Sequence, residues 1–163
     1  MSKTLENLKE AFAGESQANR KYLAFAHKAD QEKKPYAARI LRAAAEAETI
    51  HAHTHLKAMH GIGSTEENLK EAIEGETFEF TSMYPGMIKD AEAEGEKSAL
   101  RSMTLANEAE KVHAELFKKA LANPAQEPPK VFLCLVCGHV AEGHAPDSCP
   151  ICGSKSQVYK EIE

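Results

Sequence analysis

The sequence predicts an all-α four-helix bundle, made from an internally duplicated helix pair and followed by a small module that carries four cysteines. The duplication shows as a near repeat, with "NLKEAFAGES" at residues 7–16 and "NLKEAIEGET" at residues 68–77. The module shows as the clustering of all four cysteines within the last 30 residues. A period of 61 residues in only two copies does not fit a solenoid, so a duplicated antiparallel helix pair is the better interpretation.

The composition limits the classes of partner. The 163 residues have room for one ordinary domain and a small appendage. The net charge is −5 and no basic stripe appears, which argues against a nucleic-acid partner. The N-terminal "MSKTLENLKEAF" lacks the apolar run of a signal peptide, and no stretch approaches the roughly 20 apolar residues of a membrane span. We expect a cytoplasmic protein with no membrane partner.

Periodicity and stop signals place four helices. Apolar positions at alternating three- and four-residue spacing predict the first helix over residues 4–29. Pro35 suits the first turn of a second helix, which runs to about His60 before "GIGS" ends it. The "STEE" at 64–67 is a capping box that opens the third helix, and the fourth follows Gly95.

The amino-acid composition of the chain changes after the predicted bundle of residues 1–122. "NPAQEPPK" at 123–130 holds three prolines in eight residues, which is typical of a stiff linker. Residues 131–163 are too few to bury a hydrophobic core of their own, so this segment needs an additional link, such as a bound metal, to hold its fold. The sequence therefore predicts a metal-held module at the C-terminus.

Each predicted helix carries a glutamate on its apolar stripe. These four are Glu15, Glu48, Glu76 and Glu110. Burying ionised carboxylates without partners costs several kcal/mol each, so a nearby cation is needed to compensate them. "ETIH" and "EKVH" add His51 and His113, each on the same side of its helix as the preceding glutamate.

This ligand pattern is that of a dinuclear metal site. One glutamate from each of two helices and one Glu-x-x-His from each of the other two form the carboxylate-bridged arrangement of helix bundles. Mixed carboxylate and imidazole ligands suit iron or manganese. A single Glu-x-x-His is usually a solvated helix face. Two copies in phase with duplicated apolar stripes favour the metal site.

The two repeats differ by one residue. Their offset is 61 positions from Glu15 to Glu76 but 62 from Tyr22 to Tyr84 and beyond. A single insertion inside a helix is often absorbed as a π-bulge, frequently at a functional site. We therefore predict a π-bulge near residues 77–83.

The same segment adds further candidate residues. Glu79 shares a face with Glu76 and is a candidate fifth carboxylate, the alternative being a solvated glutamate. Tyr22 and Tyr84 either hydrogen-bond the metal carboxylates or are ordinary core tyrosines. Of the remaining histidines, we expect His55 to be structural and the others to be solvated: His27, His53, His60, His139 and His144.

The cysteines form two knuckles, Cys134-x-x-Cys137 and Cys149-Pro-Ile-Cys152, each followed by a glycine. Backbone amides in such tight turns can point at the sulfurs and stabilise thiolate charge. Four thiolates in a tetrahedral array bind zinc or a single iron. Zinc would make the module a structural end-piece, whereas an Fe(Cys)4 centre would carry one electron, and the spacing leaves both open.

The motifs "AFAGES", "AETIHAH", "EGETFEFTSMYPG", "AEKVHAE" and "CLVCG…CPICG" occur in this order, and over residues 3–162 the chain resembles the rubrerythrin family. The resemblance implies a ferritin-like bundle with a diiron (Fe–O–Fe) centre, then a rubredoxin-like module with one mononuclear Fe(Cys)4. Tyr22 and Tyr84 match tyrosines beside the diiron centre. His51 matches a histidine that exchanges with the carboxylate at Glu79 when the redox state changes. The implied iron ligands are Glu15, Glu48, Glu76, Glu79, Glu110 and His113 for the diiron centre, and Cys134, Cys137, Cys149 and Cys152 for the single iron.

The resemblance also implies a function. Members of the family reduce hydrogen peroxide to water as protection against oxidative stress. Their electrons come from NAD(P)H through a reductase or a rubredoxin. It further implies a homodimer in which the rubredoxin-like iron of one subunit lies near the diiron site of the other.

Two alternatives are weighed against this function. A ferroxidase or iron-storage protein also uses a carboxylate-rich diiron bundle, but it needs no electron-entry module. The second alternative is an interaction protein whose cysteine module holds zinc. A protein without iron is colourless, so colour distinguishes it from an iron protein.

Overall fold

The computed structural model describes residues 2–127 and 129–163. Met1, in the predicted bundle, and Pro128, in the predicted linker, lie outside the described residues. By compactness the chain divides between Gly63 and Ser64 into two units, each described here by itself. The division at residues 122 and 131 that the sequence suggested stays a prediction.

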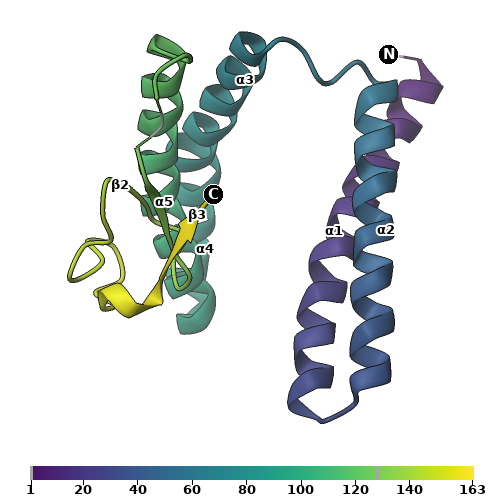
Figure 1. The fold of residues 1–163 in the computed structure, drawn as a ribbon, viewed down its shortest axis with the longest axis horizontal. Coiled ribbons are helices and arrows are strands. Elements are labelled where there is room, and N and C mark those ends of the chain that lie inside the picture. The colour runs from purple at the N-terminus through teal and green to yellow at the C-terminus, as the bar shows by residue number, and fades with distance from the viewer. Residues whose placement is uncertain (1, 128) are drawn as a thin grey trace. The chain divides into compact units, whose positions relative to one another are not determined.

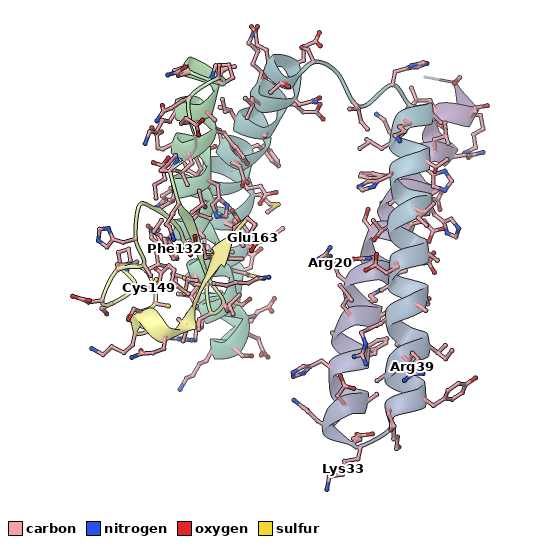
Figure 2. The ribbon with its side chains drawn as sticks, in the orientation of Figure 1. Arg20, Lys33, Arg39, Phe132, Cys149 and Glu163 are labelled. Atoms are coloured by element: carbon pink, nitrogen blue, oxygen red, sulfur yellow. The ribbon has the colours of Figure 1, made fainter. Side chains whose placement is uncertain are left out.

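The first unit is a helical hairpin of α1 (Lys3–Gln31) and α2 (Pro35–Ala58), which run antiparallel side by side (Figure 1). Lys33 lies at the tip of the connecting loop (Figure 2). The Nδ2 group of the buried Asn19 donates to the carbonyl oxygen of Ala45 at 2.6 Å and so joins the two helices. The first two predicted helices are confirmed, with Pro35 in the first turn of α2.

The second unit begins with α3 (Thr65–Phe78), a π-helix η1 (Glu79–Met83) and α4 (Tyr84–Glu94), and continues with α5 (Lys97–Ala122). The capping box is confirmed. The Glu67 N–H donates to Ser64 Oγ at 3.3 Å, and the Ser64 N–H donates to the Glu67 carboxylate at 2.7 Å. Gly95 ends α4 with a φ of 72°, a left-handed conformation that glycine adopts without strain.

The predicted π-bulge is confirmed by η1, which falls within residues 77–83. At its end the N–H of Tyr84 bonds the carbonyl oxygen of Glu79, five residues back instead of four. This wider turn absorbs the extra residue of the second repeat. Tyr84, eight residues beyond Glu76, thereby recovers the helical phase that Tyr22 has seven residues beyond Glu15.

The C-terminal module is a three-stranded antiparallel sheet in the order β2-β1-β3. The strands are β1 (Val131–Cys134), β2 (Val140–Glu142) and β3 (Tyr159–Ile162), and the 3₁₀-helix η2 (Ser156–Val158) precedes the last strand. In the register, Phe132 lies opposite Ala141 on one side and Glu161 on the other. Strand β2 contacts α5, and the Lys119 ammonium group donates to the Glu142 carboxylate there.

The buried seams of both helical units are made of small residues. Among the described helical residues, the buried ones are Asn19, Ala26, Ala29, Ala38, Ala45, Ala52, Ala91, Asn107, Ala109 and Ala114. Large side chains of the predicted stripes, such as Leu8, Phe12 and Leu41, are only half-buried. Alanine lets the helices of each unit approach closely, and the larger side chains of the apolar stripes stay partly exposed to solvent.

Among the described residues, no helix combines the length and the apolar character that crossing a bilayer requires.

The capping box gives a test of local stability. Ser64→Ala removes the side-chain acceptor at the start of α3, and we expect the free energy of unfolding to fall by about 1 kcal/mol. Chemical denaturation followed by circular dichroism measures this change. Ser102→Ala, at an exposed position inside α5, is the matched control and should leave the stability nearly unchanged. An equal loss in both variants would contradict the capping role.

Candidate metal centres

The first ligand cluster joins Glu15 of α1 to Glu48 and His51 of α2. The Nδ1 atom of His51 lies 2.8 Å from a Glu48 oxygen and 3.8 Å from a Glu15 oxygen. One ligand atom from each residue lies within 4.8 Å of the others, which is close enough for one metal ion. The Glu48 side chain is 17% exposed and the His51 side chain is 53% exposed. The cluster is therefore open on its histidine side.

The second ligand cluster repeats this geometry with Glu76 of α3 and with Glu110 and His113 of α5. The Nδ1 atom of His113 lies 2.6 Å from a Glu110 oxygen and 3.6 Å from a Glu76 oxygen. All three side chains are at most 22% exposed. The duplication in the sequence is thus a duplication of a three-ligand cluster, in which two acidic groups face one imidazole.

The surroundings of Glu76 and Glu79 disfavour the ionised forms of these two carboxyl groups. Burial, together with the negative charge of Glu110, raises the pKa of Glu76 above its ordinary value. Burial and the charge of Glu76 likewise raise the pKa of Glu79, which places Glu79 in the field of this cluster. A cation held between these oxygens would remove the repulsion, so the donor set fits a metal ion.

Tyr84 is also affected by the negative charges of these carboxylates. Burial raises its pKa, and the charges of Glu79, Glu110 and Glu76 add to the effect. Tyr22, its counterpart on α1, is half-buried. The roles of both tyrosines stay predictions.

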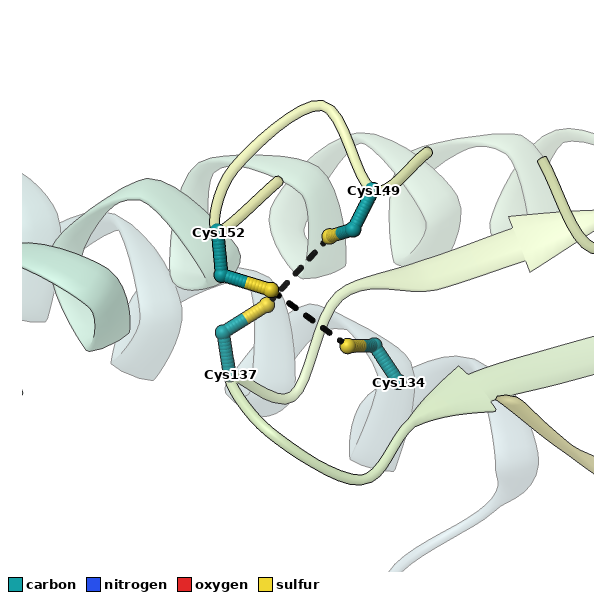
Figure 3. Close-up of side chains that lie close together, drawn as sticks. All are labelled: Cys134, Cys137, Cys149 and Cys152. Carbon is teal, nitrogen blue, oxygen red and sulfur yellow. Dashed lines mark hydrogen bonds between the residues drawn. The ribbon is translucent and has the colours of Figure 1, made fainter. Parts of the chain in front are cut away.

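The four cysteine sulfurs converge on one point in the module (Figure 3). The Sγ atoms of Cys134 and Cys152 are 3.7 Å apart, and those of Cys137 and Cys149 are 3.5 Å apart. A tetrahedral ion with bonds of about 2.3 Å has sulfur–sulfur edges of about 3.8 Å, so the pocket fits a single tetrahedral metal. Gly138 follows the first knuckle with a φ of 82°, and Gly153 follows the second with a φ of 74°.

Local hydrogen bonds favour thiolate at part of this site. Burial opposes ionisation of Cys149, but the backbone N–H groups of Cys152 and Ile151 and the Tyr159 hydroxyl lower its pKa to about 6. Burial raises the pKa of Cys137 far above its ordinary value. Deprotonation of the Cys137 thiol is therefore favoured by the charge of a bound metal ion.

His139 corrects a prediction from the sequence, which expected this residue to be solvated. It is 8% exposed, and its Nδ1 lies 2.8 Å from the Tyr159 hydroxyl oxygen. Burial and the nearby His113 lower the pKa of His139, which favours its neutral form. The residue matches no repeat, and only its position directly after the first cysteine knuckle could have signalled a role.

One hydrogen bond connects the second cluster to the cysteine module. The Nε2 atom of His113 lies 2.9 Å from the carbonyl oxygen of Gly138, which is bonded through the backbone to Cys137. Because a carbonyl can only accept, Nε2 carries the proton and Nδ1 is left to face the carboxylates. The module thus lies beside the cluster of its own chain, whereas the family resemblance implied that it lies near that of a partner.

Comparisons with known proteins agree with this layout. The family model described as "Rubrerythrin" matches residues 6–121, and the model described as "Rubrerythrin, rubredoxin-like domain" matches residues 132–160. The chain is 34% identical to Rubrerythrin-2 of Clostridium acetobutylicum, over 96% of this chain and 95% of the relative. It is 37% identical to nigerythrin of Nitratidesulfovibrio vulgaris, over 91% of this chain and 81% of the relative. A solved structure described as "Partially Reduced State of Nigerythrin" matches with a TM-score of 0.60 and 33% identity, over 99% of this chain and 88% of that one.

The cysteine pocket yields a prediction about Tyr159. Tyr159→Phe removes the hydroxyl that bonds the Cys149 sulfur, so we expect the reduction potential of an iron-loaded module to become more negative. The change also leaves buried His139 without this partner, which should cost about 1–3 kcal/mol of stability. Spectroelectrochemistry and thermal unfolding measure the two effects. Tyr36→Phe, at a side chain that is 78% exposed, is the control, and a potential equal in both variants would exclude the proposed bond to sulfur.

Proposed function

Because the chain belongs to the rubrerythrin family, we propose that it reduces hydrogen peroxide to water at a diiron site and receives its electrons through an iron held by its four cysteines. The family consists of oxidoreductases that are generally diiron peroxidases with a rubredoxin-like iron site. In this proposal the electrons come from a rubredoxin or from an NAD(P)H-dependent reductase. The protein would protect the cytoplasm from peroxide, working as a homodimer.

The proposed ligands follow from the two clusters and the cysteine pocket. The diiron ligands are Glu15, Glu48, His51, Glu76, Glu79, Glu110 and His113, and the single-iron ligands are Cys134, Cys137, Cys149 and Cys152. Carboxylate and imidazole donors suit iron, and the sulfur separations suit one tetrahedral ion. When bound, the iron pair supplies the two electrons that peroxide reduction needs, and the single iron replaces them.

Protons for the two water molecules come from the chain in this proposal. Tyr84 and Glu79 both have raised pKa values because burial and neighbouring carboxylates disfavour their ionised forms. Each is therefore able to keep a proton beside the metal ligands and to donate it from Tyr84 Oη or a Glu79 carboxyl oxygen. Tyr22 offers the matching hydroxyl from α1.

The observation that carries the proposal is the hydrogen bond from His113 Nε2 to the Gly138 carbonyl oxygen. It joins a proposed ligand of the diiron site to the backbone of a cysteine knuckle through one ring and one peptide unit. A protein that only stores or oxidises iron has no need of this connection. A peroxidase that is re-reduced after each turnover requires such a short link.

Rapid mixing without air tests the function. The iron-loaded, fully reduced protein is mixed with hydrogen peroxide or with dioxygen, and the absorbance of the cysteine-bound iron is followed. We expect faster reoxidation by peroxide than by dioxygen, by about tenfold or more, because members of the family are generally diiron peroxidases and a two-metal site would act as Lewis acid and template for peroxide. Faster reaction with dioxygen, accompanied by consumption of added ferrous iron, would establish a ferroxidase instead. Absence of any cysteine–iron colour would exclude the electron-entry role.

Glu79 provides a second test. Glu79→Ala removes a proposed ligand and proton carrier, so we expect peroxide turnover to fall by about 10²-fold while the spectrum of the cysteine-bound iron is unchanged. Steady-state peroxide reduction and visible absorbance measure the two properties. Glu74→Ala, at an exposed position of α3, is the control. Equal turnover in the two variants would remove Glu79 from the site.

A further inference from the structure

We propose that His139 is a positioning residue for the metal that the four cysteines bind. Its Nδ1–H donates to the Tyr159 hydroxyl oxygen and so directs the hydroxyl hydrogen to the sulfur of Cys149. As a means of tuning electron transfer, this role rests on the cysteine-bound iron of the proposed function. The hydrogen bonds themselves need only a metal at the four sulfurs.

The backbone of His139 is tied to two of the metal ligands. Its carbonyl oxygen accepts from the Cys134 N–H at 2.8 Å, and its own N–H bonds the Cys137 sulfur. Tyr159, the partner of its side chain, is the first residue of β3 and pairs with Cys134 in the register. Both residues are therefore fixed by the same backbone that carries the sulfurs.

The side chains of His139 and Tyr159 form a buried polar pair. His139 is 8% exposed, and its ring meets the Tyr159 ring edge-on, with the centroids 6.0 Å apart and an interplanar angle of 86°. The His139 Nδ1 atom and the Tyr159 hydroxyl oxygen are 2.8 Å apart, an ordinary hydrogen-bond distance. A buried polar group without a partner is costly, so this bond must be made, and one of the two groups must donate in it.

The direction of this bond follows from the number of hydrogens. The Tyr159 hydroxyl has one hydrogen and two neighbours able to accept it, His139 Nδ1 and the Cys149 sulfur. Cysteine binds a metal as thiolate, so the sulfur carries negative charge. A hydrogen bond to a charged acceptor is roughly twice as strong as one between neutral groups, so the hydroxyl hydrogen goes to the sulfur. The Tyr159 oxygen is then left to accept, and Nδ1 of His139 must carry the donated proton.

Donation by His139 strengthens the bond between the Tyr159 hydroxyl and the sulfur. A hydroxyl that accepts one hydrogen bond becomes a better donor in the next, because bonds in a chain polarise one another. Reduction of the cysteine-bound iron adds one electron and increases the negative charge on its sulfurs. A stronger donor at Cys149 therefore favours the reduced form and raises the reduction potential. Tyr159 makes the contact with the ligand, and His139 sets its direction and strength.

The position of the proton on the His139 ring is the direct test. The full chain is loaded with zinc, which takes the same four sulfurs as a tetrahedral ion and leaves the nuclear magnetic resonance signals sharp. Long-range ¹H–¹⁵N spectra then show which ring nitrogen carries hydrogen, and the His139 ring is assigned through its own backbone signals. We expect hydrogen on Nδ1. Hydrogen on Nε2 alone would mean that Tyr159 donates to the imidazole, and it would overturn the proposal.

Reduction potentials of the iron-loaded protein test the consequence. His139→Leu removes the donor, so we expect the equilibrium constant for reduction of the cysteine-bound iron to fall by about fivefold, the net effect of about one hydrogen bond. His139→Asn places an amide N–H close to the position of Nδ1 and should recover most of this loss. His144→Leu, at an exposed position of the same module, is the control and should keep the wild-type potential. Equal potentials in His139→Leu and this control would contradict the role of His139.

A double-mutant cycle with Tyr159→Phe separates positioning from packing. Without the hydroxyl, His139 has no oxygen to donate to, so His139→Leu should leave the potential of Tyr159→Phe almost unchanged. A shift of the same size in both backgrounds would show that His139 acts only through the packing of the knuckle, and it would overturn the proposal. None of these measurements depends on turnover. A protein with the expected ring proton and potentials that does not reduce peroxide would overturn the proposed function and leave the role of His139 established.

Discussion

The constraint on which the rest of the structure depends is the cost of gathering carboxylates between helices. In the second cluster this cost is visible, because burial and mutual repulsion raise the pKa of Glu76 and of Glu79. Such a site is stable only with a cation and with helices held at a fixed spacing. The alanine seams supply that spacing, since Ala45, Ala52, Ala109 and Ala114 let helices approach closely beside the ligands. The helices are thus held together by these alanines, and the carboxylate and histidine side chains beside them stay available to bind a metal.

Much of the bundle was predictable because its signals are local. The capping box at Ser64, the proline in the first turn of α2 and the change of offset between the repeats all act within a few residues. The π-helix could be located by counting alone, because one extra residue in a helix must be absorbed within about a turn. The two clusters also follow from helical phase, and the structure brings together the residues that this phase groups.

The rest depends on contacts between distant segments, which periodicity does not encode. His139 was expected in solvent, yet it is buried against Tyr159, twenty positions along the chain. The contact of His113 with Gly138 likewise depends on how a short sheet docks on α5. Both contacts involve the loop between β1 and β2, whose place depends on how the short strands pair, and three or four residues per strand are too few to reveal this pairing in a sequence.

The docked module also makes the two duplicated histidines unequal. Nε2 of His113 is held by the Gly138 carbonyl oxygen and its side chain is 22% exposed, so its ring orientation is fixed from outside the cluster. His51 has the same spacing to its glutamate, but its side chain is 53% exposed. The imidazole of His113, held by this hydrogen bond, would keep its orientation if the charge of a metal changed. The more exposed imidazole of His51 has room to rotate. Glu79, the added carboxylate, begins the wider π-turn and has no counterpart on α1, where Ala18 stands. The duplication thus produced two similar halves, which the docked sheet made unequal at the histidines and the inserted residue made unequal at Glu79.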